Sequence, residues 1–572
     1  MADDALTLLE RSLEAYRADP AAVLDPDALV QAARILIAAV PEALRPSDNQ
    51  DAWALALRAP ATLHLFRARE LGSDGDADAE AAATLFGIIQ RTTPAAVPEP
   101  LRPAVADPAR QDLISRTRGV IAWEHHIAVL DQAAASAGSV AVLAEVALLW
   151  TAALEQTPAG DPGRARYWAR LAAAQVTRFE LTGAPADLDA AIGLYRRALD
   201  ADFSGAPGAA VRAGRQHRAR GWFRRAGPAA SPAEAAGPAE AVSPAEAIGR
   251  DETTGQAEEA GGGFATHDLA RASILSGLCD ALRLRSERTG SAADLDAAVE
   301  AGQAAIAVAA GHPHLAGHLS NLGLALRSRS IRTGSAADLD AAVAASQAAT
   351  GLIGEDDPLR AAALSNLGLA LRLRFERAGS AADLDAAVAA GRAAVAAAPD
   401  SDPRRARMLG NLSIALRRRA EQTGSLPDLD AAVGAGWAAV ASTPDNDPSH
   451  ATVAANLGNA LIARFERAGS AADLDAAVEA SQTAVAVTPA DHPDRAIKLS
   501  NLGAVLLTRF NQGGDCADLD AAVAAGRAAL AATPKDHPNH RVIKGNLALM
   551  RRAQAERNGP GGGVADTGLD GG

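Results

Sequence analysis

The sequence predicts an all-α solenoid that forms a right-handed superhelix. The dipeptide Asn-Leu recurs at a constant step of 45 residues, at Asn321, Asn366, Asn411, Asn456, Asn501 and Asn546. The string DLDAA and a turn proline keep nearly the same step through this region. A fixed period of this length is typical of repeat proteins, in which each unit buries its apolar face only against its neighbours. The repeat therefore predicts a binding surface rather than a catalytic pocket.

The first helix of each unit is predicted by an apolar stripe. In residues 357–399, leucines and Phe375 follow one another at steps of three and four, which is a helical period. The pair Asp357-Pro358 is expected to start this helix, because aspartate caps helix N-termini and proline is tolerated in the first turn. Gly379 is expected to end it, since glycine readily adopts the positive φ of a helix C-terminus.

A second helix is predicted directly after this glycine. Ser380 and Asp383 have the spacing of a capping box, in which the hydroxyl and the carboxylate both accept from backbone amides. The following segment is rich in alanine, the strongest helix former, and stops at Pro399. Each unit is thus predicted to be a pair of helices.

Degenerate copies of the unit extend the array toward both ends. Turn glycines at steps of 44 or 45 residues continue backwards through Gly290, Gly227, Gly183 and Gly138 with one gap. The predicted organisation is 1–160 degenerate helical repeats, 161–227 clearer repeats, 228–262 a flexible insertion, 263–538 six regular repeats, 539–559 a capping helix and 560–572 a disordered tail. The insertion is predicted to be flexible because it is acidic and rich in Pro and Gly, and it would divide the array into two blocks, about 1–227 and 263–559.

Composition indicates a cytoplasmic protein. The acidic start of the chain differs from a secretory signal, and no long apolar run lacks charge, so neither export nor membrane insertion is expected. The net charge of −14 argues against bulk binding of nucleic acid. Residues 211–225 are a local exception, with six arginines beside Trp222 and Phe223. A nucleic-acid site is one interpretation; a repeat helix is the favoured one, because Phe223 has the register of a first helix.

No residue is predicted to be catalytic, to bind a cofactor or to ligate a metal. Nucleophile, metalloprotease, phosphate-loop and dinucleotide motifs are absent from the sequence. The histidines His312, His314 and His318 invite a zinc interpretation, yet His312-Pro313 occupies the slot of Asp357-Pro358 in the next unit. His312 is therefore interpreted as a turn residue, and no cysteine or carboxylate cluster completes a four-ligand zinc set. The DLDAA aspartates are interpreted as charges at helix N-termini.

The repeated unit resembles the tetratricopeptide repeat family. Asn366-Leu367-Gly368, Leu371, Ala387, Ala394 and Pro399 match, in order, the leucine-glycine, large, small, small and proline positions of that repeat. The resemblance implies a non-enzymatic scaffold that grips a peptide or protein segment in a concave groove lined by first helices. The unit here is longer than the usual 34 residues, so a HEAT-like solenoid stays the alternative fold. Small residues replace the usual bulky one in the second helix and predict close helix contact, at Gly302, Ser346, Gly391, Gly436, Ser481 and Gly526.

The long repeat also resembles bacterial arrays that often precede a CHAT cysteine-protease domain or accompany signalling ATPases. The residues that carry this resemblance are NLG followed by RFERxGSxxDLDAA. The protease's catalytic histidine and cysteine have no counterpart that we can place in this chain. The resemblance therefore implies a regulatory or accessory partner of such a protease or ATPase, as an alternative to a general scaffold.

A column of asparagines is the candidate binding surface. On a helical wheel, Asn366, Ala370 and Arg377 share one face between two apolar stripes. Stacked amides can both donate to and accept from the backbone of an extended peptide. The alternative is that each asparagine satisfies a carbonyl of the neighbouring helix, and Trp437 can equally fill a packing gap. The candidate peptide-binding residues are Asn321, Asn366, Asn411, Asn456, Asn501, Arg332, Arg377, Arg467 and Trp437.

Overall fold

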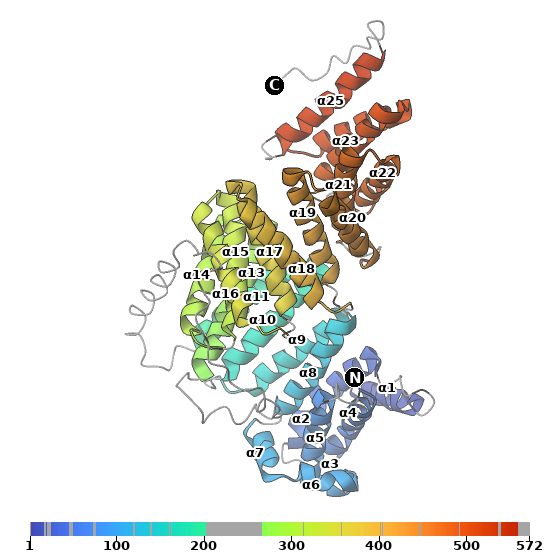
Figure 1. Cartoon of the computed structure of the whole chain (residues 1–572). Coiled ribbons are helices and arrows are strands. Elements are labelled where there is room, and N and C mark those ends of the chain that lie inside the picture. Colours follow the sequence, from blue (N-terminus) through green and yellow to red (C-terminus); the bar gives the residue numbers. More distant parts are fainter. Residues whose placement is uncertain are drawn as a thin grey trace, which may run out of the picture. The chain divides into compact units, whose positions relative to one another are not determined.

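The computed structural model is built of helices and short turns (Figure 1). It describes residues 2–16, 19, 24–44, 50–71, 76–117, 120–137, 140–159, 161, 163–201, 266–312, 314–355, 357, 359–400, 402, 404–444, 447, 449–490, 492, 494–535 and 539–558. None of these residues lies in a strand. The chain divides into two compact units, Met1–His312 and Pro313–Gly572. In each unit helices pack in consecutive pairs and each pair packs on the next, which makes the fold an α-solenoid.

The first part of the Met1–His312 unit is less regular than the rest. Its helices are α1 (Ala2–Ala15), α2 (Pro26–Leu44), α3 (Gln50–Ala56), α4 (Arg58–Leu71), α5 (Asp76–Thr92), α6 (Arg102–Val105), α7 (Pro108–Arg116), α8 (Val120–Ala137) and α9 (Val140–Gln156), with 3₁₀ turns η3 (Pro94–Ala96) and η4 (Glu99–Leu101) between α5 and α6. Large side chains such as Trp123 and Phe86 fill its core. The indole N–H of Trp123 donates to the backbone carbonyl of Leu36 on α2 at 2.9 Å, so the polar atom of this buried aromatic side chain is paired.

A chain of buried hydrogen bonds crosses four of these helices. His126 Nε2 lies 3.1 Å from the Leu29 carbonyl, and its Nδ1 lies 2.8 Å from His64 Nε2. His64 Nδ1 is 2.6 Å from a carboxylate oxygen of Asp78, which also accepts from Arg67. Burial, followed by the proximity of His64, holds the pKa of His126 well below its ordinary range, so this imidazole is neutral. Because a carbonyl only accepts, the His126 proton sits on Nε2 and its Nδ1 accepts from His64.

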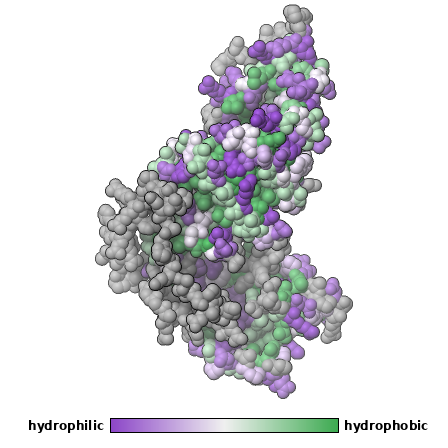
Figure 2. All heavy atoms as spheres, viewed as in Figure 1, coloured by the Kyte–Doolittle hydropathy of each residue, from purple (hydrophilic) through white to green (hydrophobic). Residues whose placement is uncertain are grey.

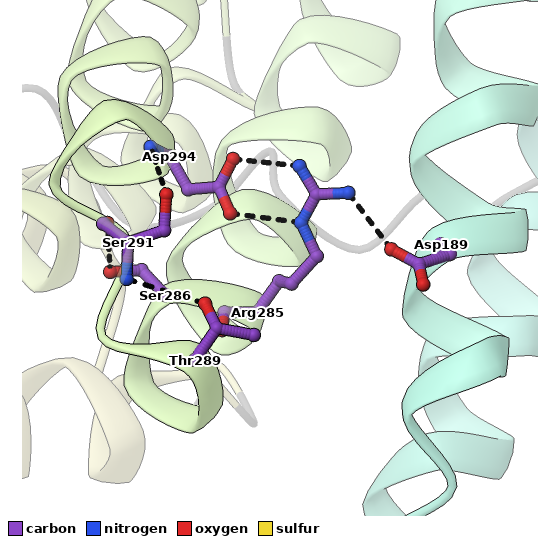
Figure 3. Close-up of polar contacts among 6 residues, drawn as sticks. All are labelled: Asp189, Arg285, Ser286, Thr289, Ser291 and Asp294. Carbon is purple, nitrogen blue, oxygen red and sulfur yellow. Dashed lines mark hydrogen bonds and ion pairs between the residues drawn. The ribbon is translucent and has the colours of Figure 1, made fainter.

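Regular helix pairs begin with α10 (Gly163–Thr182) and α11 (Pro185–Ala201), followed by α13 (Thr266–Thr289) and α14 (Ala292–Val308). Although α11 and α13 are separated by residues 202–265, they pack directly on each other. Arg285 of α13 holds Asp294 with two bonds of 2.9 and 2.7 Å and reaches Asp189 of α11 at 2.9 Å (Figure 3). The solenoid therefore continues across the insertion without a break.

This continuity differs from the expected two blocks. The two compact units divide after His312, and not at the acidic insertion. Residues 202–265 themselves, with the basic segment and the predicted boundaries at 227, 228 and 262, lie outside the described residues. Those boundaries stay predictions, as does the tail at 560–572.

The Pro313–Gly572 unit contains five complete pairs and one last helix. Its first, or A, helices are α15 (Leu315–Thr333), α17 (Arg360–Ala378), α19 (Arg405–Thr423), α21 (His450–Ala468) and α23 (Arg495–Gly513). Its second, or B, helices are α16 (Ala336–Leu352), α18 (Ala381–Ala397), α20 (Leu426–Ala441), α22 (Ala471–Ala486) and α24 (Cys516–Ala531). The last helix, α25 (His540–Asn558), packs on α24 and α23 as a further A helix would.

The turn between A and B helices has the predicted geometry at its glycine and serine. Gly379 has a φ of 72° and ends α17, and the equivalent glycines of the other pairs have the same left-handed φ. Ser335 accepts from the amide of Asp338 at 3.1 Å as the N-cap of α16. The A helix begins slightly later than predicted, at Arg360, after a turn in which Asp357 accepts from the Leu359 amide at 2.8 Å.

The predicted role of the capping-box aspartate was wrong. Its carboxylate does not accept from a backbone amide of its own helix start; it receives two hydrogen bonds from an arginine nine residues earlier. In the central pair, Arg374 binds both oxygens of Asp383 at 2.8 and 2.6 Å. A bidentate guanidinium–carboxylate pair is stronger than a bond to a neutral amide, so the arginine wins. The same pair occurs at Arg178–Asp187, Arg285–Asp294, Arg329–Asp338, Arg419–Asp428, Arg464–Asp473 and Arg509–Asp518.

The second aspartate of DLDAA links one pair to the next. Arg374 also reaches Asp340 of the preceding B helix, at 3.4 Å. Equivalent bonds join Arg419 to Asp385, Arg464 to Asp430 and Arg509 to Asp475. Each arginine thus staples its own turn and the pair before it, and we call this arrangement the Arg–Asp staple.

The small residues of the B helices were predicted to allow close helix contact, and the structure places the following A helix against them. A Cβ built on Gly436 would lie 3.3 Å from the Cα of Leu457, and one on Gly391 would lie 3.1 Å from Leu412 Cδ1. Gly526 is packed equally tightly against α25, where Met550 Sδ would be 2.8 Å away. Within the described part of the chain, we find no helix with the length and apolarity that crossing a bilayer requires.

Candidate protein-binding surface

The asparagine column lies at the middle of the A helices. Asn366, Asn411, Asn456 and Asn501 occupy equivalent positions on α17, α19, α21 and α23, and each is half-buried. The residue that follows each of them, such as Leu457, points into the apolar core. One face of each A helix therefore presents an amide between buried neighbours.

Three rungs of this column are engaged with the preceding A helix. Asn366 Nδ2 donates to Ser320 Oγ at 3.2 Å, and Asn411 Nδ2 donates to Ser365 Oγ at the same distance. At the end of the array Asn546 donates to Ser500 at 3.0 Å. In these rungs the asparagine amide links neighbouring A helices through a serine hydroxyl. The alternative interpretation expected each asparagine to bond a backbone carbonyl of the neighbouring helix; the acceptor is instead a side chain.

Two rungs lack the serine. The residues 46 positions before Asn456 and Asn501 are Gly410 and Ala455. Within the described residues neither asparagine has a hydrogen-bond partner for its amide. Their amide atoms are not among the fully buried unpaired polar atoms, so they retain contact with solvent. Sequence reasoning missed this difference, although the signal was present in the residue that precedes each Asn-Leu dipeptide.

The candidate arginines have mixed surroundings. Arg377 donates to the hydroxyl and to the carbonyl of Ser330, both at 2.7 Å. Arg467 donates to the Gly424 carbonyl at 3.2 Å. Both therefore bind the C-terminal end of the preceding A helix, where cations are favoured by the helix dipole. Arg332 is exposed, and the described residues offer its side chain no partner.

Trp437 lies on the outside of its B helix. Trp437 is 48% exposed, so about half of its surface is available for contact. Other exposed large apolar residues, such as Leu352 and Leu359, are scattered. Figure 2 likewise shows hydrophilic and hydrophobic residues interspersed over the visible face.

The other titratable groups have structural positions. His492 takes the aspartate's place in the inter-pair turn and accepts from the Asp494 amide at 3.1 Å, as predicted for a turn histidine. Cys279 is buried, which raises the pKa of its thiol to about 12, whereas Cys516 is exposed, and neither forms a disulfide. No group of three or more His, Cys, Asp or Glu side chains suited to a metal ion occurs among the described residues.

Comparisons with known proteins identify one repeat. A family model for the tetratricopeptide repeat matches residues 450–494. No curated protein matches the chain. Among solved structures, the chain is similar to Nro1, a hypoxic regulator of sterol synthesis described as a nuclear import adaptor, at 16% identity over 49% of this chain and 93% of that chain, with a TM-score of 0.30. It is similar to the TPR domain of P58(IPK) at 14% identity over 77% and 99%, with a TM-score of 0.21. A de novo designed helical repeat protein matches at 14% identity over 50% and 98%, with a TM-score of 0.12.

The matched segment is the part of the array that contains α21 and α22. It carries the same asparagine, turn glycine and DLDAA aspartates as the pairs before and after it. Its N-cap serine is shared with the pair before it, whereas the N-cap of the pair after it is Asp515. Residues 450–494 are a tetratricopeptide repeat, and the neighbouring pairs repeat its sequence frame at a step of 45 residues.

Proposed function

We propose that this protein is a scaffold that binds an extended segment of another protein along the asparagine column of its A helices. The observation that carries the proposal is the column itself, because a half-buried amide recurs at one position of successive A helices. An extended backbone presents donors and acceptors at a regular spacing, and an amide side chain matches both. Trp437 and Arg332, exposed on the same unit, are proposed as additional contacts.

The test is selection of a ligand followed by mapping. A phage-displayed library of linear dodecapeptides is panned on the full-length protein, and enriched peptides are measured by fluorescence anisotropy. Hydrogen–deuterium exchange of the complex should then show protection on α17, α19, α21 or α23. Failure to enrich any peptide, or protection confined to B helices, would contradict the proposal.

The sequence resemblance implies a CHAT-type protease or a signalling ATPase as the partner class, and we propose such a protein as one source of the bound segment. A pair of genes encoding this chain and a CHAT protein in the same host would allow both to be co-expressed and co-purified. Co-purification that is lost when the asparagines are replaced would support the proposal. The cytoplasmic location stays a prediction of the sequence.

A further inference from the structure

The asparagines of the column differ in whether their side-chain amide already has a hydrogen-bond partner within the protein. At Asn366, Asn411 and Asn546 one amide hydrogen is donated to a serine of the preceding A helix. This bond fixes the direction of the side chain and removes a donor from the surface. At Asn456 and Asn501 the serine is replaced by Gly410 and Ala455, and no side chain of the described residues accepts from either amide.

A third amide lies beside the open rungs. Asn459 is one turn after Asn456 on α21, where the equivalent positions of the two preceding A helices are Leu369 and Ile414. It is half-buried, and it too has no hydrogen-bond partner within the part of the chain that the structure describes. A polar side chain therefore replaces an apolar one at the place where the serine is lost.

The contact between neighbouring A helices also varies along the array. Neighbouring A helices contact each other directly at α15 and α17, at α17 and α19, at α19 and α21, and at α23 and α25. Between α21 and α23 the direct contact is marginal, and the two helices are held mainly through α22. A Cβ on Gly410 would lie 3.6 Å from Asn456 Nδ2, so Asn456 lies against α19, the preceding A helix. The interval of marginal contact is on the other side of α21, between α21 and the helix that carries Asn501.

We infer that Asn456, Asn459 and Asn501 form the principal contact site of the column, and that its occupant is the backbone of an extended peptide segment. This inference rests on the proposed function and narrows it to one interval of the array. Three amides without internal partners offer donors and acceptors together, which an extended backbone satisfies and a purely anionic or purely apolar ligand does not. The serine-bound rungs act as spacers that hold A helices in register.

The experiment uses the full-length protein and one fluorescein-labelled dodecapeptide selected on it. Asn456→Ala and Asn501→Ala should each weaken binding about 10-fold, since each amide can make one or two hydrogen bonds to the backbone. Asn366→Ala and Asn546→Ala are the matched controls at serine-bound rungs, and their Kd should change by less than about twofold. Circular dichroism melts of the four variants verify that each one is folded.

A second set of variants keeps the asparagines and closes the open rungs. A Cβ on Gly410 would lie 3.6 Å from Asn456 Nδ2, an ordinary contact, so a serine fits and its hydroxyl can take the amide. Gly410→Ser combined with Ala455→Ser should therefore weaken peptide binding about fivefold or more while raising the melting temperature. This variant also covers the case in which an alanine substitution unfolds the protein.

The outcomes separate the two proposals. Equal weakening by all four alanine variants, or no weakening by any, would overturn the preference for the open rungs and leave a peptide-binding scaffold in place. Peptides that bind with protection on B helices, or no enriched peptide at all, would overturn the scaffold proposal and this inference with it. Loss confined to Asn456→Ala, Asn501→Ala and the double serine variant is the result we expect.

Discussion

The Arg–Asp staple predicts that two neighbouring aspartates contribute very differently to stability. Arg419 binds Asp428 of its own pair through two bonds of 2.8 and 2.7 Å, and Asp385 of the preceding pair through one of 3.3 Å. The Asp428 side chain is 12% exposed, whereas that of Asp385 is 66% exposed. Asp428→Asn removes the charge from a mostly desolvated bidentate pair and should cost about 2 kcal/mol. Asp385→Asn removes a solvent-screened bond and should cost about 0.5 kcal/mol.

Thermal unfolding followed by circular dichroism measures both effects. For a unit of this size, about 2 kcal/mol corresponds to a decrease in Tm of roughly 4–8 °C, and about 0.5 kcal/mol to roughly 1–2 °C. The hydrogen bonds from Arg419 lower the pKa of Asp428, so its contribution is present above the ordinary pKa of 3.8 and is lost as pH falls through the lowered value. The Tm difference between wild type and Asp428→Asn should therefore shrink below about pH 4. Equal losses for the two variants, or a difference independent of pH, would refute the reasoning.

Three further predictions concern the insertion, helix contact and acid stability. Residues 442–449 connect a B helix to the next A helix in the regular array. Replacing residues 202–265 by a copy of them should leave the Tm of the Met1–His312 unit within about 2 °C of wild type, because α11 and α13 already pack together. A cooperative loss of helix would contradict this. In urea denaturation, Gly436→Ala should lower the free energy of unfolding by roughly 1–3 kcal/mol through overpacking, while Gly434→Ala, with nothing within 4 Å of the added Cβ, should raise it by roughly 0.5–1 kcal/mol. Changes of the same sign would contradict the packing argument. The pKa of His126 is well below 6.5 in the folded protein, so only the unfolded chain gains a proton at this residue as pH falls below about 6.5, and stability should decline. His126→Gln should reduce this decline in Tm between pH 7.5 and 5.5. An unchanged slope would show that other groups cause the decline.

The helices and turns of the Pro313–Gly572 unit were predictable because local chemistry determines them. A glycine at the A-helix end, a serine three residues before an aspartate and an alanine-rich segment specify the hairpin almost without tertiary information. The small residue at Gly391 or Gly436 also predicted a close helix contact, although it did not identify the partner helix. The same rules erred on the aspartate of the capping box, because a carboxylate near a helix start has more than one favourable partner. Its arginine is nine residues away, on the other helix of the hairpin, and only the folded turn brings the two together.

The candidate site was predictable as a column and not as separate rungs. The Asn-Leu dipeptide places an amide on every A helix, but its partner, such as Ser365 for Asn411, is 46 residues earlier and belongs to a different hairpin. Sequence periodicity draws attention to what repeats, whereas Gly410 and Ala455 carry information because they do not. The buried chain from Asp78 through His64 to His126 was missed for the same reason, since it joins helices of the irregular region that no repeat relates.

The Arg–Asp staple is kept between α11 and α13, although residues 202–265 separate these helices in the sequence. A solenoid is stabilised by contacts within a hairpin and between adjacent hairpins, and the connection from a B helix to the next A helix contributes little to either. Arg285 recognises Asp189 with the geometry that Arg374 has toward Asp340, although the first pair is 96 residues apart and the second 34. Lengthening a loop costs free energy only logarithmically, about 0.6 kcal/mol for each doubling. The segment between a B helix and the next A helix can therefore vary in length and sequence. The arginines keep the register of the surrounding hairpins, and with it the spacing of the asparagine column.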